Sequence, residues 1–296
     1  MSRNKHTLII IVGPTASGKT GLAIKLARKL NGEIISADSR QVYRGMDIGT
    51  GKATKQERRQ ARHYLLDIAN PKKEYNVSHF KRDAERTIVN IHEKKMLPFL
   101  VGGTAFWVDS VAYDFALPNV KPNKTLRKKL SNLSVDILYA MLKKLDPARA
   151  RTIDKRNPYR LIRAIEIVKA TKKPIGKIKK KSPYNLVWLG INMSREILYS
   201  RIDKRLAARI KLGMITEVKH LLKQGVSAKR LISIGLEYRY VTLYIQGKLT
   251  KKEMMERLEN AIHHYAKRQM TWWKRNKDIH WITSQKQAEK LIKLSS

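Results

Sequence analysis

The chain has 296 residues, of which 42% are hydrophobic, and this apolar content suffices for a sizeable core. It excludes a wholly disordered protein, and the absence of cysteine excludes disulfides and thiolate metal sites. Lysine and arginine number 63 against 24 aspartates and glutamates, a formal net charge of +39. Such a charge attracts polyanions, so nucleic acid is the natural partner, although a lysine-rich lineage would carry the same charges on solvated helix faces.

The first patterned stretch is an apolar run at residues 8–12, followed by a loop and a helical pattern at residues 22–30. The loop has the spacing G-x-x-x-x-G-K-[ST], which between a strand and a helix predicts a phosphate-binding P-loop. We expect phosphate oxygens to be bound by Gly13, Pro14, Thr15, Ala16, Ser17, Gly18, Lys19 and Thr20. Lys19 would reach the outer phosphates and the Thr20 hydroxyl would ligate Mg²⁺, whereas a plain glycine-rich turn would leave both side chains unexplained.

A second short strand is predicted at residues 33–37, and it ends on Asp38. Ligands of open α/β sheets bind at the carboxyl ends of the strands, so Asp38 is expected to face the phosphate site. Residues 40–52 follow without periodicity and carry three glycines, which is typical of a functional loop. A further strand is expected at residues 64–69, and Ser78 is expected to cap a helix.

A buried strand at residues 97–101 runs into Gly102, Gly103 and Thr104. Many P-loop NTPases end the corresponding strand on an acidic residue that holds Mg²⁺, and none stands here. The two glycines let backbone approach a ligand closely, and Thr104 adds a hydroxyl. This ending argues against ATP hydrolysis.

The middle of the chain shows helical patterns and no strand pattern, which predicts a small all-helical insertion. We therefore expect an α/β fold: a P-loop core with a parallel sheet flanked by helices, formed by residues 1–116 and 185–296, and an insertion at residues 117–184. A basic loop is expected at residues 177–181. Within the insertion, Arg160 and Arg163 could meet a phosphate backbone, although a solvated basic face explains them equally well.

A helix after residue 194 carries Arg201, Arg205 and Arg209 at i, i+4 and i+8, so one of them could turn toward a pyrophosphate. The last long helix, at about residues 251–275, interleaves Lys267 and Arg268 with large aromatic residues, as suits phosphate contact and base stacking. Its two histidines, His263 and His264, have no third ligand nearby in the sequence, so no metal site is expected there.

Four stretches then carry a family resemblance: residues 13–20, 35–50, 100–104 and 265–272. Together they resemble the motifs of the bacterial tRNA dimethylallyltransferases, over nearly the whole chain. The resemblance implies a P-loop kinase-like core with a helical insertion that helps to grip the anticodon stem-loop of tRNA. It also implies transfer of the dimethylallyl group from dimethylallyl diphosphate to N6 of adenine 37, in tRNAs that read codons beginning with U, with release of diphosphate.

The resemblance assigns the general base to Asp38 and a supporting hydroxyl to Thr104. It assigns diphosphate binding to all of residues 13–20, Lys19 among them, and to Arg205, with Arg201 the poorer match. Contacts to tRNA are expected at Asp38, Ser39, Arg40, Gln41, Arg160, Arg163, Lys267 and Arg268. Two departures are visible: the insertion between Pro122 and Leu138 is shorter than expected of the family, and Gly235-Leu236-Glu237-Tyr238 stands where the family usually has a glycine-tyrosine pair.

Three rival functions use the same motifs: a small-molecule or nucleotide kinase, a prenyltransferase of free adenine nucleotides, and an RNA-binding P-loop NTPase. A charge of +39 has no use in a small-substrate kinase, and the basic insertion and terminal helix argue against a prenyltransferase of free nucleotides. The third function requires turnover of ATP or GTP and would tolerate loss of Asp38. The initial apolar run is too short for a signal peptide or a membrane span. We expect a cytoplasmic monomer whose partners are Mg²⁺, dimethylallyl diphosphate and tRNA.

Overall fold

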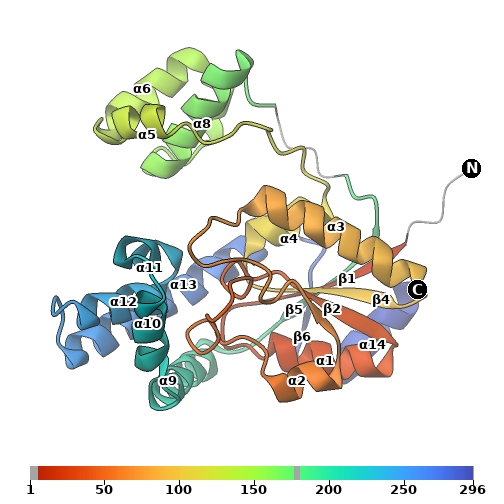
Figure 1. The fold of residues 1–296 in the computed structure, drawn as a ribbon. Coiled ribbons are helices and arrows are strands. Elements are labelled where there is room, and N and C mark those ends of the chain that lie inside the picture. Colours follow the sequence, from red (N-terminus) through yellow and green to blue (C-terminus); the bar gives the residue numbers. More distant parts are fainter. Residues whose placement is uncertain (1–5, 177–180, 296) are drawn as a thin grey trace, which may run out of the picture. The chain divides into compact units, whose positions relative to one another are not determined.

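The computed structural model describes residues 6–176 and 181–295, so most of the predicted basic loop at 177–181 lies outside the described residues. The chain divides into two compact units, one formed by Met1–Asp114 with Lys181–Ser296 and the other by Phe115–Lys180. The sequence-based boundaries for the insertion were 117 and 184. Figure 1 shows the elements of both units.

The larger unit is built on a six-stranded sheet in the order β3-β2-β4-β1-β5-β6, and every paired neighbour is parallel. The strands are β1 (Thr7–Val12), β2 (Gly32–Ser36), β3 (His63–Tyr64), β4 (Leu97–Val101), β5 (Asn185–Ile191) and β6 (His280–Ile282). Because all strands point the same way, their carboxyl ends share one edge. The P-loop, Asp38 and Gly102 each follow a strand at that edge.

The sheet is buried on both faces, as parallel sheets require. Its central strand β1 is the most enclosed, since every side chain from Leu8 to Val12 is fully buried. Figure 1 shows α3 (Val77–Glu93) and α4 (Ala105–Ala112) over one face, and α1 (Lys19–Lys29) and α14 (Gln285–Ser295) over the other. Ile9 and Ile11 of β1 pack with Leu26 of α1 and Ile292 of α14, which joins the two ends of the chain in one core.

Most of the remaining helices of the larger unit lie between β5 and β6 in the sequence. The remaining helices are α2 (Lys55–Gln60), α9 (Arg195–Lys211), α10 (Met214–Lys223), α11 (Ala228–Ile234), α12 (Leu236–Ile245) and α13 (Lys251–Trp273). Serine or threonine caps four of them, because Thr54, Ser194, Ser227 and Thr250 accept backbone hydrogen bonds at the starts of α2, α9, α11 and α13. No helix within the described residues is long and apolar enough to cross a membrane.

Helices are the only regular secondary structure among the described residues of the smaller unit. Its helices are α5 (Lys124–Ser131), α6 (Val135–Leu145), α7 (Pro147–Thr152) and α8 (Pro158–Thr171). They enclose a separate apolar core around Leu138, Leu142 and Leu161. Within it lies Glu166, whose side chain is 1% exposed and accepts hydrogen bonds from Arg127, Arg163 and the backbone of Asn123.

Two local predictions were wrong. The strand expected at residues 64–69 ends at Tyr64, because Leu65 and Asp67 adopt positive φ angles of 60° and 58° that no strand can continue through. The helix expected to be capped by Ser78 is capped by Asn76 instead, whose side chain accepts hydrogen bonds from the backbone of Ser78 and His79.

Candidate active site

The P-loop connects β1 to α1 and bends at two glycines. Gly13 has a φ of 148° and Gly18, the N-cap of α1, has a φ of 92°, conformations that residues with a Cβ rarely adopt. The loop closes on its own lysine, since Lys19 Nζ donates to the carbonyl oxygens of Gly13 at 3.0 Å and Pro14 at 2.6 Å. The Lys19 ammonium is therefore held at the loop.

Burial lowers the pKa of the Lys19 ammonium to about 8, against an opposing effect of the Asp38 carboxylate and with a further contribution from Arg205. Desolvation favours the neutral form of a lysine, and a nearby cation does the same. An anion bound against Lys19 would favour its charged form. The loop thus offers a poorly compensated positive charge to a phosphate group.

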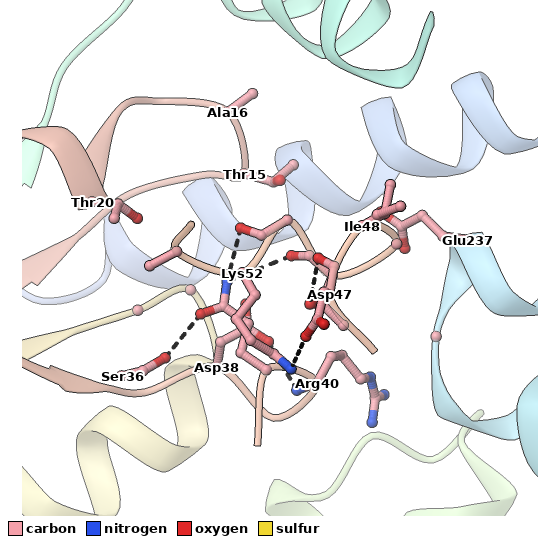
Figure 2. A pocket seen from close by; sticks show the side chains of 18 of the residues that line it. Thr15, Ala16, Thr20, Ser36, Asp38, Arg40, Asp47, Ile48, Lys52 and Glu237 are labelled. Carbon is pink, nitrogen blue, oxygen red and sulfur yellow. Dashed lines mark hydrogen bonds and ion pairs between the residues drawn. The ribbon is translucent and has the colours of Figure 1, made fainter. Parts of the chain in front are cut away.

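Asp38 stands two residues beyond the end of β2, as the strand pattern predicts. Its Oδ1 accepts a hydrogen bond from the backbone N–H of Arg40 at 2.9 Å, so the side chain also caps the turn that follows the strand. Asp38 is half-buried and lines the same pocket as Lys19. Figure 2 shows its side chain among those of the pocket wall.

Thr104 lies beside this turn, at the N-cap of α4. Its hydroxyl accepts from the backbone N–H of Ser39 at 3.0 Å and donates to the Ser39 hydroxyl at 3.3 Å. The neighbouring Gly102 passes so close to β2 that a Cβ there would lie 2.2 Å from the carbonyl oxygen of Ala37. Thr104 is not among the residues that line the pocket, so it touches the pocket through Ser39.

The pocket itself has a volume of about 950 Å³ and is open to solvent. Its walls come from the P-loop, the end of β2, the loop that precedes α2, the end of β4, and helices α9, α12 and α13. Figure 2 labels lining residues from Thr15 to Glu237 around one space. Residues that are more than 200 positions apart in the sequence thus face each other across it.

Arg205 and Arg209 of α9 both line the pocket, but they are used differently. Arg209 donates to the Glu237 carboxylate at 3.2 Å and to the Gly49 carbonyl at 3.4 Å. Within the described part of the chain, no hydrogen bond or ion pair occupies the Arg205 guanidinium. Burial, helped by the charge of Arg209, lowers the pKa of Arg205 to about 10. Arg205 is accordingly the arginine of α9 that is available to an anion.

Glu237 lies in the stretch around Gly235 where the sequence departs from the family's usual glycine-tyrosine pair. Burial raises the pKa of the Glu237 carboxyl, and the Arg209 guanidinium opposes that shift. Its side chain points into the space drawn in Figure 2. Glu237 therefore contributes a carboxyl group to the pocket wall that is paired with Arg209 of α9.

Gln269 of α13 has a role that the sequence did not reveal. Its buried side chain donates from Nε2 to the Gly103 carbonyl at 2.9 Å, and its Oε1 accepts from the Thr15 backbone N–H at 2.8 Å. It thereby fastens the P-loop to the end of β4. The residue lies inside the stretch 265–272 that carries the family resemblance, which was the only available signal.

The residues predicted to contact tRNA are distributed over both units. Ser39, Arg40, Gln41 and Arg268 line the pocket with Asp38, and the Arg268 guanidinium lies 5.9 Å from the centre of the Tyr265 ring. Lys267 is exposed outside the pocket lining.

Arg160 and Arg163 belong to the smaller unit, on α8. The guanidinium of Arg163 is occupied by Glu166 and the Val120 carbonyl, whereas Arg160 is exposed. Arg163 is thus less free than Arg160 for a phosphate.

The expectation that His263 lacks further ligands was wrong. Its Nε2 lies 2.7 Å from a carboxylate oxygen of Asp203, and Glu259 completes a group whose ligand atoms all lie within 4.8 Å of one another. Helix α9 brings Asp203 to α13, a tertiary contact that sequence spacing cannot reveal.

A comparison with known protein families distinguishes between the functions considered for this chain. The profile of the family described as IPP transferase matches residues 41–276, most of the chain. The chain belongs to this family.

Curated relatives match nearly the whole chain. A tRNA dimethylallyltransferase of Pelotomaculum thermopropionicum is 40% identical over 285 residues, covering 94% of this chain and 91% of that protein. A protein called tRNA dimethylallyltransferase 1, from Azobacteroides pseudotrichonymphae genomovar. CFP2, is 44% identical over 292 residues, with 95% and 94% covered. Such relatives are enzymes by name.

Solved structures agree with the fold. The full-length tRNA isopentenylpyrophosphate transferase of Bacillus halodurans has a TM-score of 0.72 and 37% identity, covering 98% of this chain and 95% of that one. A eukaryotic dimethylallyltransferase acting on tRNA has a TM-score of 0.77 at 26% identity, with 90% of this chain and 69% of that chain covered. The α/β fold predicted from the sequence is confirmed.

Proposed function

We propose that this IPP transferase moves the dimethylallyl group of dimethylallyl diphosphate to N6 of adenine 37 in tRNAs that read codons beginning with U, and releases diphosphate. The observation that carries the proposal is the meeting of Lys19, Arg205 and Asp38 in one pocket. Two cations suit a diphosphate, and a carboxylate beside them suits proton removal from an amine. The relatives named above, all tRNA-modifying by name, support the same chemistry.

In this proposal the P-loop binds the diphosphate of the prenyl donor. Breaking the allylic C–O bond leaves negative charge on diphosphate, so groups that meet those oxygens stabilise the transition state more than the ground state. The backbone N–H groups at the start of α1, the Lys19 ammonium and the Arg205 guanidinium supply that charge. We expect Lys19 to leave the carbonyls of Gly13 and Pro14 when phosphate oxygens arrive.

A magnesium ion fits the same site. The Thr20 hydroxyl lines the pocket next to Lys19 and makes no hydrogen bond to any residue in the described ranges, and hard oxygen donors are what Mg²⁺ prefers. When bound there by Thr20 and the donor's phosphates, the ion would neutralise charge on the leaving group.

In this proposal Asp38 acts on the acceptor, the N6 amine of the adenine. The lone pair of the adenine N6 amine is delocalised into the ring, so a proton must leave as the new C–N bond forms. Only Oδ1 of Asp38 is engaged by another described residue, the Arg40 backbone, which leaves Oδ2 to accept that proton. The adenine must be flipped out of the anticodon loop to reach it, and Ser39, Gln41 and Arg268 lie where its neighbours would pass. Thr104 supports this turn through Ser39.

The rival functions are not favoured. A kinase or NTPase would be expected to use an acidic residue after β4, where this chain has Gly102 and Gly103. The family and the named relatives also point to prenyl transfer rather than to ATP turnover. A cytoplasmic location, a monomeric state and the gripping of the anticodon stem by the helical unit are further parts of the proposal.

The proposal is tested by incubating the protein with unmodified tRNA, Mg²⁺ and dimethylallyl diphosphate, followed by digestion and analysis of the nucleosides. We expect one prenylated adenosine per susceptible tRNA and one diphosphate released for each. A matched reaction with ATP in place of the prenyl donor should give neither product. Phosphate release from ATP without nucleoside modification contradicts the proposal.

A further inference from the structure

Glu217 of α10 holds the backbone of the loop that forms one wall of the pocket. Its Oε2 accepts hydrogen bonds from the N–H groups of Asp47 at 2.8 Å and Ile48 at 2.7 Å. Its Oε1 accepts from the N–H of Gly49 at 3.0 Å. One carboxylate thus satisfies three consecutive backbone donors, and charge-assisted bonds of this kind are stronger than neutral ones.

Tyr238 of α12 completes this arrangement. Its hydroxyl donates to Oε1 of Glu217 at 2.7 Å, and burial raises the pKa of Tyr238 so that the donor stays protonated. The ring packs directly on Gly49, where a Cβ would lie 2.7 Å from the Tyr238 Cζ. Contact with the ring therefore requires glycine at this position. The loop packs closely against α12 and is hydrogen-bonded to α10.

The opposite side of the loop holds Gln41. The Gln41 Nε2 faces the carbonyl oxygens of Thr50 at 3.5 Å and Gly51 at 3.4 Å, and its Oε1 accepts from the Ser36 hydroxyl at 3.0 Å. These partners decide which end of the Gln41 amide is the donor. Gln41 lines the pocket, whereas Glu217 does not.

We propose that Glu217 is a positioning residue for tRNA recognition, which fixes the Gln41 amide by holding residues 47–51. This inference rests on the proposed function, because it takes the pocket to be where the target base and its neighbours bind. Glu217 touches neither substrate, and its influence passes through the loop backbone. The donor site, formed on the P-loop, has no contact with Glu217 and is expected to be unaffected.

The chemistry of the side chain offers an isosteric test. A carboxylate presents only acceptors, whereas glutamine would turn an N–H₂ group toward backbone N–H donors or the Tyr238 hydroxyl. Glu217→Gln therefore preserves volume and breaks the anchor. Tyr238→Phe removes one hydroxyl and keeps the ring on Gly49. Glu256→Gln, at an exposed site on α13, is the matched control for charge.

The experiment measures KM for both substrates, kcat, and equilibrium binding of a fluorescent anticodon stem-loop. For Glu217→Gln we expect a tRNA KM and stem-loop Kd raised about tenfold, with the donor KM within twofold of the parent. Tyr238→Phe should show about a threefold rise, and Glu256→Gln none. A loss of stability alone would lower the active fraction and leave both KM values unchanged. If Glu217→Gln does not fold, the split between substrates in Tyr238→Phe decides the question.

Stem-loop affinity within twofold of the parent in both anchor variants overturns the inference, and so do equal rises in the two KM values. A parent protein that binds the stem-loop but transfers no prenyl group contradicts the proposed function instead. In that case the binding measurement still tests Glu217, because it needs no turnover.

Discussion

The backbone N–H of Thr15 donates to the side-chain oxygen of Gln269 across 254 residues of sequence, at 2.8 Å. The P-loop is therefore not held only by the strand and helix that flank it. The other end of the same amide holds Gly103, so one side chain sets the spacing between the loop and the end of β4. Two of the pocket's walls depend on it.

Gln269→Ala should weaken donor binding and stability together. It leaves the Thr15 N–H and the Gly103 carbonyl without their buried partner, which costs about 1–3 kcal/mol for each unsatisfied group. We expect a lower melting temperature and a donor KM raised severalfold, measured by thermal unfolding and steady-state kinetics. Gln246→Ala, exposed at the end of α12, is the control. An unchanged donor KM would show that the bridge does not shape the loop.

The Asp38→Asn variant distinguishes the proposed role of Asp38 as general base from its role in capping the turn. Asparagine can still accept the hydrogen bond from Arg40 but cannot take a proton, so tRNA affinity should stay within a few fold. The expected loss is about 10² to 10⁴ in kcat, the usual range for a removed general base. Single-turnover rates with saturating donor and pre-bound tRNA give the measurement. A rate within about threefold of the parent would mean that Asp38 only caps the turn.

Donor binding should depend on pH through Lys19. Its pKa is lowered to about 8, so the free enzyme carries the full charge below that pH and loses it above. Because the diphosphate favours the charged form, kcat/KM for the donor should fall as pH rises through about 8. In Lys19→Ala the donor KM should be raised, kcat lowered, and this pH dependence lost. A parent profile that is flat from pH 7 to 9 contradicts the assignment.

Binding of tRNA should weaken steeply with salt. Replacing Arg160, Lys267 and Arg268 together by glutamine should reduce the log–log slope by about 0.7 to 0.9 per phosphate contact that is lost. The matched control replaces three exposed lysines on α1 and α14, namely Lys25, Lys286 and Lys290. Stem-loop affinities over a salt series give both slopes. Equal slopes for the two triple variants would mean that the positive charge attracts tRNA without defined phosphate contacts at these residues.

Arg163 should matter for stability more than Arg160. Burial alone would raise the pKa of Glu166, but hydrogen bonds from Arg127 and Arg163 hold it at about 2. This stabilisation is present above the ordinary glutamate pKa and is lost as pH falls toward 2. Arg163→Gln should lower the melting temperature at pH 7, and its difference from the parent should shrink in acid. Arg160→Gln, exposed on the same helix, should melt like the parent.

Much of the fold follows from local patterns. The buried run before Gly13 and the spacing to Lys19 specify strand, loop and helix, and glycines after β4 indicate close backbone approach, which Gly102 shows against Ala37. Parallel strands then place Asp38 and Lys19 at one edge. These inferences need only periodicity, chain direction and the steric needs of glycine.

Other parts of the site depend on tertiary contacts that no local pattern encodes. Glu217 has an ordinary helical sequence around it, and its three backbone partners lie at least 168 positions away. The strand expected beyond Tyr64 failed for a similar reason: Asp67 is drawn to the buried ammonium of Lys52 and to Arg58. Long-range ion pairing overrode the apolar pattern there.

The helical unit interrupts the sheet-forming part of the chain in sequence, yet all six strands belong to the larger unit. Strand β1 pairs with β4 on one side and with β5 on the other, and residues 115–180 are synthesised between these two neighbours. On the ribosome, the P-loop therefore emerges long before Arg205 and Gln269. A nascent chain that ends within the helical unit has four of the six strands, and its P-loop lacks the contacts from Gln269. The pocket is completed only when α13 leaves the exit tunnel, because Tyr265, Arg268 and Gln269 of that helix form part of its wall.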